Sequence, residues 1–129
     1  MSAWDAYITS MKGMGLQICG IFGQDGNVWA KAPEMQASQQ DVASIVACIK
    51  TGSFSDGIYL NGIKYTVITF GTDFATAKCR NAPTDNEKYL LHAALGKTCI
   101  VIGGISGAAE RSATKFVEEI RDHLAKSDY

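Results

Sequence analysis

Hydrophobic and polar residues follow two different periods along this chain. Towards its end, hydrophobic residues recur at spacings of three and four, which places them on one face of a helix. These residues are Phe116, Val117, Ile120 and Leu124. The pattern predicts a final helix over residues 111–129 whose apolar face packs against the rest of the protein.

Two more helices are predicted nearer the start. Ser2 and Asp5 stand three residues apart, as in a capping box, so a first helix is expected to begin there. Ser38 and Asp41 repeat the pattern, and Gly52 is expected to end this second helix. Its apolar face would consist of Val42, Ile45, Val46 and Ile49.

A period of two, typical of strands, describes the segments between these helices. Strands are predicted at residues 16–22, from Val28 to near Pro33, and at 58–60, 63–70, 74–80, 87–95 and 98–102. The dipeptides Asp25-Gly26 and Asn61-Gly62 predict hairpins with type I′ turns. The later connections, such as 81–86, are too short for parallel crossovers. The strands are therefore expected to run antiparallel, and the glycine-rich residues 103–107 to lead into the final helix.

The predicted order is helix, two strands, helix, about five strands, helix. A sheet with two apolar faces is best covered by helices on both faces. This order predicts an α/β fold of the α+β type, with a central antiparallel sheet of about six to seven strands. At 129 residues and without a linker, the chain is expected to form one domain over residues 1–129.

Composition excludes several classes of function. A net charge of -1 gives no bulk attraction to nucleic acid or to anionic lipid. No apolar run approaches the roughly 20 residues of a membrane span, and no signal peptide opens the chain, so a cytoplasmic protein is expected. The cysteines at 19, 48, 79 and 99 are far apart and form no C-x-x-C pair. They are expected to be reduced core residues, and no metal or cofactor is predicted.

The sequence contains no recognisable catalytic motif. Gly96-Lys97-Thr98 resembles the end of a phosphate-binding loop, but Leu91 stands where that loop needs glycine, so a turn is expected. His92 and His123 are far apart in sequence, and His92 in the middle of a strand is expected to be a packed or edge residue. We therefore predict no catalytic residues and no enzyme activity.

Five of the chain's aromatic side chains form a candidate set for binding, although they are scattered along the sequence: Trp4, Tyr7, Trp29, His123 and Tyr129. Ordinary core packing is one interpretation. Chain ends seldom supply the centre of a core, however, and clusters of exposed aromatic residues indicate binding surfaces. If the two terminal helices lie side by side, these residues become neighbours.

Three segments resemble the profilin family. They are SAWDAY at residues 2–7, GQDGNVWA at residues 23–30 and the last fourteen residues, which include Asp122-His123-Leu124 and Tyr129. The resemblance extends over the whole chain, in length and in element order. It implies that the N- and C-terminal helices pack on one face of the sheet and the remaining helix on the other.

The resemblance also implies a function. Profilins bind monomeric actin and proline-rich segments, such as those of formin-type assembly factors, and many bind phosphoinositides. A cytoplasmic, cytoskeleton-associated monomer that regulates actin polymerisation and nucleotide exchange on actin, without a cofactor or nucleic acid, is therefore expected. The implied polyproline-binding residues are Trp4, Tyr7, Trp29, His123 and Tyr129, with Leu124 beside them. The implied actin-binding residues are Lys64, Thr66, Val67, Ile68, Arg80, Lys115, Glu118 and Glu119.

Two other functions remain open from the residues alone. One is a small-molecule sensor with a PAS-like sheet, which needs a sizeable cavity in its core. The other is a thiol enzyme, which needs a cysteine beside a histidine. The sequence shows neither feature.

Overall fold

A computed structural model describes residues 4–13, 15–32, 35, 37–53, 58–60, 63–79, 90–105, 112–127 and 129. Within them the helices are α1 (Trp4–Gly13), α2 (Gln39–Thr51) and α3 (Ser112–Lys126). The strands are β1 (Ile18–Gly23), β2 (Val28–Lys31), β3 (Ile58–Leu60), β4 (Ile63–Phe70), β5 (Phe74–Lys78), β6 (Leu90–Leu95) and β7 (Cys99–Ile105).

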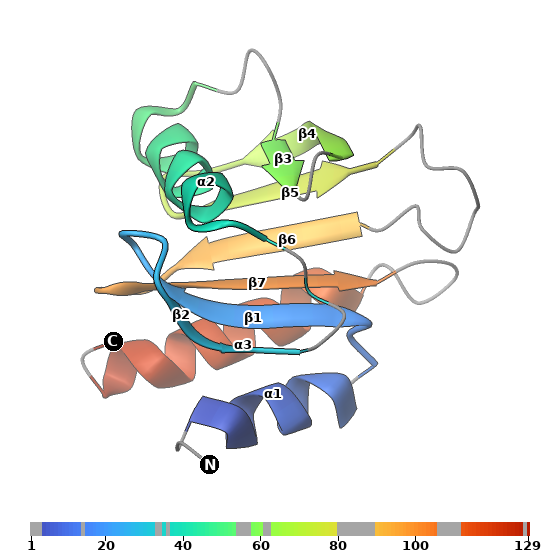
Figure 1. Cartoon of the computed structure of the whole chain (residues 1–129), viewed down its shortest axis with the longest axis vertical. Coiled ribbons are helices and arrows are strands. Elements are labelled where there is room, and N and C mark those ends of the chain that lie inside the picture. The colour runs from blue at the N-terminus through green and yellow to red at the C-terminus, as the bar shows by residue number, and fades with distance from the viewer. Residues whose placement is uncertain are drawn as a thin grey trace.

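The strands form a single antiparallel sheet in the order β2-β1-β7-β6-β5-β4-β3. The helices α1 and α3 lie on one face of this sheet and α2 lies on the other (Figure 1). The predicted fold class is confirmed, including the position of the two terminal helices on the same face.

Each face of the sheet contributes to its own hydrophobic core. Along β1, Cys19 and Ile21 point towards α1 and α3, while Ile18 and Phe22 point towards α2. This alternation follows from the two-residue period of a strand. Because both faces are apolar, each needs helices to cover it, and this requirement fixes the three-layer arrangement.

The predicted boundaries of α2 are confirmed at both ends. The Ser38 hydroxyl accepts a hydrogen bond from the Asp41 N–H at 3.0 Å, and the Asp41 carboxylate accepts one from the Ser38 N–H at 3.3 Å. Gly52 adopts a left-handed conformation with φ 70° and donates its N–H to the Cys48 carbonyl oxygen. The helix therefore begins and ends where its capping residues predict.

The first hairpin differs from the predicted two-residue turn. The Gly26 N–H donates to the Gly23 carbonyl oxygen at 2.9 Å, and the Gly23 N–H donates to the Asn27 carbonyl oxygen at 2.8 Å. The loop is therefore three residues long, and its last residue, Gly26, has φ 94°. The Asp25 carboxylate stabilises it by accepting from the Asn27 N–H at 3.0 Å.

Strand β7 continues into the segment that the sequence assigned to a connection. Gly103 pairs with Cys19 and His92, and Gly104 pairs with Ile18 and Leu91. A Cβ atom on Gly103 would lie 2.6 Å from Cγ2 of Val117 on α3. The absence of a side chain thus allows the helix to pack closely on the strand.

The other predicted boundaries differ by a few residues. β1 begins at Ile18 rather than residue 16, and α3 ends at Lys126, so Tyr129 follows the helix. Several predicted features lie outside the described residues: the capping residue Ser2, Pro33, the turn Asn61-Gly62, and residues 80–89 and 106–111. The hairpin that Asn61-Gly62 predicts is nevertheless present, because Leu60 pairs with Ile63.

Candidate functional site

Aromatic side chains from both ends of the chain meet where α1 and α3 lie side by side. The two helices run in opposite directions, so the first turns of α1 and the last turns of α3 are at the same end of the molecule (Figure 1). The rings of Tyr7 and His123 are tilted at 51° to each other with centroids 5.7 Å apart. Ile8 and Met11 on α1, and Ile120 on α3, are buried beneath them and hold the helices on the sheet.

A second aromatic pair lies at the same end of the molecule. The rings of Trp29 on β2 and Tyr129 are nearly perpendicular, at 79°, with centroids 5.9 Å apart. This edge-to-face arrangement is a favoured one for aromatic rings. Tyr129 is 39% exposed, and Trp29 is half-buried. We refer to Tyr7, Trp29, His123 and Tyr129 as the aromatic cluster.

Two further residues were predicted to belong to this cluster. Trp4 is the first residue of α1, and its side chain lies outside the described part of the structure. Leu124 is 1% exposed and packs in the core between the helices and the sheet. The structure therefore places Leu124 beneath the aromatic cluster, where it supports the rings, rather than beside them at the surface.

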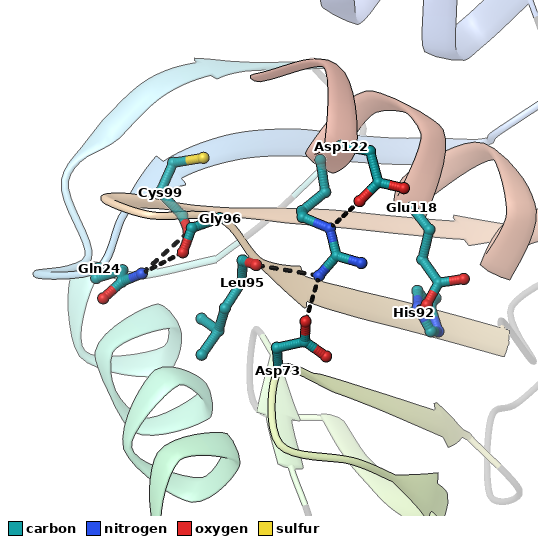
Figure 2. A network of polar contacts seen from close by, with 9 residues as sticks. Gln24, Asp73, His92, Leu95, Gly96, Cys99, Glu118 and Asp122 are labelled. Atoms are coloured by element: carbon teal, nitrogen blue, oxygen red, sulfur yellow. Dashed lines mark hydrogen bonds and ion pairs between the residues drawn. The ribbon is translucent and has the colours of Figure 1, made fainter. Parts of the chain in front are cut away.

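Arg121, which the sequence did not single out, fixes the end of α3 that carries His123. Its Nη1 donates to the Asp73 carboxylate at 3.0 Å and to the Leu95 carbonyl oxygen at 3.1 Å, and its Nε donates to the Asp122 carboxylate at 2.7 Å (Figure 2). One side chain thereby connects α3, the β4–β5 turn and the end of β6. A side-chain exposure of 13% agrees with a structural role for this guanidinium.

The predicted actin-binding residues lie mainly on the α3 side of the sheet. Tyr65 on β4 packs into the α2-side core, so its neighbours Lys64 and Thr66, both exposed, point to the opposite face. Val67 packs against the α2-side core instead, and Ile68 is 52% exposed beside an irregularity in the β4–β5 pairing. These four residues are close in sequence but do not share one face of the sheet, because side chains alternate along the strand and the pairing is irregular at Ile68.

On α3, Lys115 and Glu119 are exposed and Glu118 is partly buried. Helical spacing places Lys115, Glu118 and Glu119 on one side of the helix, away from the buried Val117 and Ile120. Arg80 lies outside the described residues. We refer to Lys64, Thr66, Lys115, Glu118 and Glu119 as the mixed-charge face.

A buried histidine lies behind this face. His92 on β6 is 0% exposed, and its Nδ1 is 2.8 Å from the Thr76 hydroxyl, while its Nε2 is 3.6 Å from a carboxylate oxygen of Glu118. The ring also stacks on Phe74, at 25° and 5.6 Å. Burial, reinforced by the positive charge of Arg121, lowers the pKa of His92 to about 4. The imidazole is therefore neutral at pH 7 and acts as a packed polar residue of the core, as predicted.

The features needed by the two alternative functions can be compared with the structure. Burial raises the pKa of the Cys99 thiol to about 11, so this thiol is protonated at neutral pH and is a poor nucleophile. A wide hollow of about 630 Å³ beside Thr72, Gly96 and Arg121 is open to solvent and is not a cavity in the core. A smaller hollow of about 230 Å³ lies at the surface between α2 and β3. It is lined by Gln40, Asp41, Ser44, Ile45, Cys48, Ile58 and Tyr59.

Two properties of the described residues concern metal ions and membranes. No three His, Cys, Asp or Glu side chains in these residues lie close enough together to hold a metal ion. No helix in the same part of the chain combines the length and the apolar character needed to cross a membrane.

Comparisons with known proteins agree with the geometry. A model of the profilin family matches residues 2–129. A Bombyx mori profilin is 35% identical over 75 residues, a match that covers 55% of this chain and 59% of that protein. Mouse profilin IIa, solved in complex with a double repeat from the FH1 domain of mDia1, superposes with a TM-score of 0.83 at 18% identity, covering 99% of this chain and 100% of that chain. LokiProfilin2, solved in complex with rabbit actin, superposes with a TM-score of 0.76 at 14% identity and covers 98% of both chains.

Proposed function

This chain belongs to the profilin family, and from that premise we propose that it binds proline-rich segments through the aromatic cluster and monomeric actin through the mixed-charge face. The proposed role is to regulate actin polymerisation and nucleotide exchange on actin. It is a binding role, not an enzymatic one, exercised in the cytoplasm with the cytoskeleton. Phosphoinositide binding remains a prediction from family resemblance.

The contact between the two chain ends supports proline binding. A polyproline II helix is already extended, so binding it avoids much of the roughly 1–2 kcal/mol per residue that ordering a flexible chain costs. Its carbonyl groups have no internal partners and can accept hydrogen bonds from Tyr O–H or Trp N–H. The ring centroids are 5.7 Å apart in the Tyr7–His123 pair and 5.9 Å apart in the Trp29–Tyr129 pair. Together the two pairs offer flat apolar faces and donors of this kind. The complex of mouse profilin IIa with FH1 repeats agrees with this proposal.

The distribution of charged side chains on the mixed-charge face supports the proposed contact with actin. Lys64 and Thr66 on β4 share the α3 side of the sheet, and α3 adds one exposed lysine and two glutamates. A surface that carries charges of both signs fixes the orientation of a protein partner more than it raises the affinity for that partner. The LokiProfilin2 complex shows that a protein of this fold contacts actin.

The two proposed surfaces lie on different parts of the molecule and can act together. The accessible surface is 6595 Å², and a standard interface uses about 800 Å² per partner. Both partners can therefore be held at once, which would deliver actin monomers to proline-rich assembly factors.

An actin assembly assay tests the proposal. With pyrene-labelled actin, the native chain should slow spontaneous assembly. A proline-rich formin segment should restore assembly by binding the complex of this chain with actin. Lys64→Glu together with Lys115→Glu should abolish the effect on actin while leaving polyproline binding intact. Lys50→Glu, on α2 and exposed, is the matched control and should behave as the native chain. No effect of the native chain on actin, or equal effects of the control and the double variant, would contradict the proposal.

A further inference from the structure

We infer that residues 96–99, the turn between β6 and β7 with the first residue of β7, position both members of the Trp29–Tyr129 pair. They would thereby set the affinity for a proline-rich ligand without touching it. This inference rests on the proposed function of the aromatic cluster. It assigns a positioning role to Gln24 and Gly96, which have no aromatic ring.

The turn holds Tyr129 through its main chain. The Thr98 N–H donates to the Tyr129 main-chain oxygen at 2.6 Å, and the Cys99 N–H donates to the same oxygen at 3.2 Å. The Thr98 hydroxyl adds a longer contact at 3.4 Å. Tyr129 follows the end of α3, so these bonds, together with its own N–H donating to the Leu124 carbonyl oxygen at 2.9 Å, fix where its ring can lie.

The same turn holds the hairpin that carries Trp29. Gln24 lies in the loop between β1 and β2, and its N–H donates to the Thr98 carbonyl oxygen at 3.2 Å. Its side-chain amide nitrogen is 3.0 Å from the Gly96 carbonyl oxygen and 3.4 Å from that of Cys99 (Figure 2). The Gly23 backbone before it is also close to the indole, since a Cβ there would lie 3.1 Å from Nε1 of Trp29.

Gly96 is the point at which the two attachments meet. A Cβ atom on Gly96 would lie 2.7 Å from the Tyr129 main-chain oxygen and 2.9 Å from Sγ of Cys99. Backbone atoms cannot move aside as the end of a flexible side chain can. Any side chain at this position therefore displaces Tyr129 from the turn, and with it one ring of the edge-to-face pair.

The test measures binding of decaproline by tryptophan fluorescence and calorimetry. Gly96→Ala should weaken binding about three- to tenfold, the equivalent of losing one aromatic contact. Gly13→Ala is the matched control, because a Cβ on Gly13 meets nothing within 4 Å, and it should bind as the native chain does. Circular dichroism confirms that each variant is folded.

A double-mutant cycle distinguishes positioning from general destabilisation. If Gly96 acts only through Tyr129, then Gly96→Ala should weaken binding no further in a chain that already carries Tyr129→Ala. Additive losses would overturn the inference. Should Gly96→Ala fail to fold, Gln24→Met keeps the length of the side chain but removes its donor, and the expected loss is about two- to fivefold. Because Gln24 holds the hairpin of Trp29, this variant is combined with Trp29→Ala in the corresponding cycle, and additive losses there would equally overturn the inference.

The outcomes also separate this inference from the proposed function. A native chain that does not bind decaproline overturns the proposed function itself. A native chain that binds, with folded Gly96→Ala and Gln24→Met variants of unchanged affinity, overturns the positioning role alone.

Discussion

Acid should destabilise this fold through one buried side chain, His92. Its pKa is lowered from 6.5 to about 4, first by burial and then by the positive charge of Arg121. Between these two pH values the unfolded chain takes up a proton on this imidazole and the folded chain does not. The contribution to stability is therefore fully present above pH 6.5 and is lost as the pH falls through this window.

The size of the effect follows from linkage. One proton taken up on unfolding costs about 1.4 kcal/mol for each pH unit, so the full window amounts to about 3 kcal/mol. A domain of this kind has a total stability of about 5–15 kcal/mol. Losing about 3 kcal/mol would therefore remove a substantial share of the total free energy of unfolding.

Urea unfolding of the native chain and of His92→Gln, at about pH 7 and about pH 5, isolates this residue. Glutamine can still bond to the Thr76 hydroxyl but does not titrate. The other ionisable side chains are present in both proteins, so the comparison isolates the residue at position 92. The native chain should lose about 2 kcal/mol more than the variant between these two pH values. Losses that agree within about 0.5 kcal/mol would refute a buried, neutral imidazole at this position.

Three further outcomes are expected. Gly103→Ala should lower the free energy of unfolding by about 1–3 kcal/mol, measured in urea, because the added methyl group meets Val117 of α3. Leu124→Ala should cost about 2–5 kcal/mol in the same assay, whereas Leu124→Met should cost under about 1.5 kcal/mol and preserve decaproline binding, since this residue lies in the core. Iodoacetamide should modify the partly exposed Cys48 before the buried Cys99, whose pKa is raised to about 11, as peptide mass spectrometry of the native chain can show.

Local signals in the sequence predicted the elements well where capping and periodicity agree. The boundaries of α2 follow from Ser38, Asp41 and Gly52, because each of these residues satisfies a backbone group of its own helix. The hairpin of β3 and β4 follows likewise from its turn residues. In these cases the determining interaction spans only a few residues.

The glycines of β7 show where local signals fail. Gly103 and Gly104 have low strand propensity, so the sequence favours a connection. In the structure they pair with β1 and β6. Glycine is required there because Val117 and Ile18 come so close that a side chain would not fit. That constraint comes from the packing of another element, so it is not visible in the segment itself.

The supporting contacts of the site could not be predicted for a similar reason. Arg121 reaches Asp73, 48 residues away, and Gln24 reaches Gly96, 72 residues away. Neither residue belongs to a motif. Their roles depend on the register of the sheet and the angle of α3, which only the assembled fold determines. The aromatic residues were predictable because their number and their places at the chain ends are unusual for a core.

The central claim is that α1 and α3 bring the two ends of the chain into one aromatic surface that binds a proline-rich ligand. Isotope-edited NOE measurements on the labelled protein with unlabelled decaproline test it most directly. Proline ring protons should show NOEs to the rings of Tyr7, Trp29, His123 and Tyr129 together. NOEs confined to another surface, such as that around the exposed Tyr59 and Phe70, or none at saturating peptide, would contradict the account.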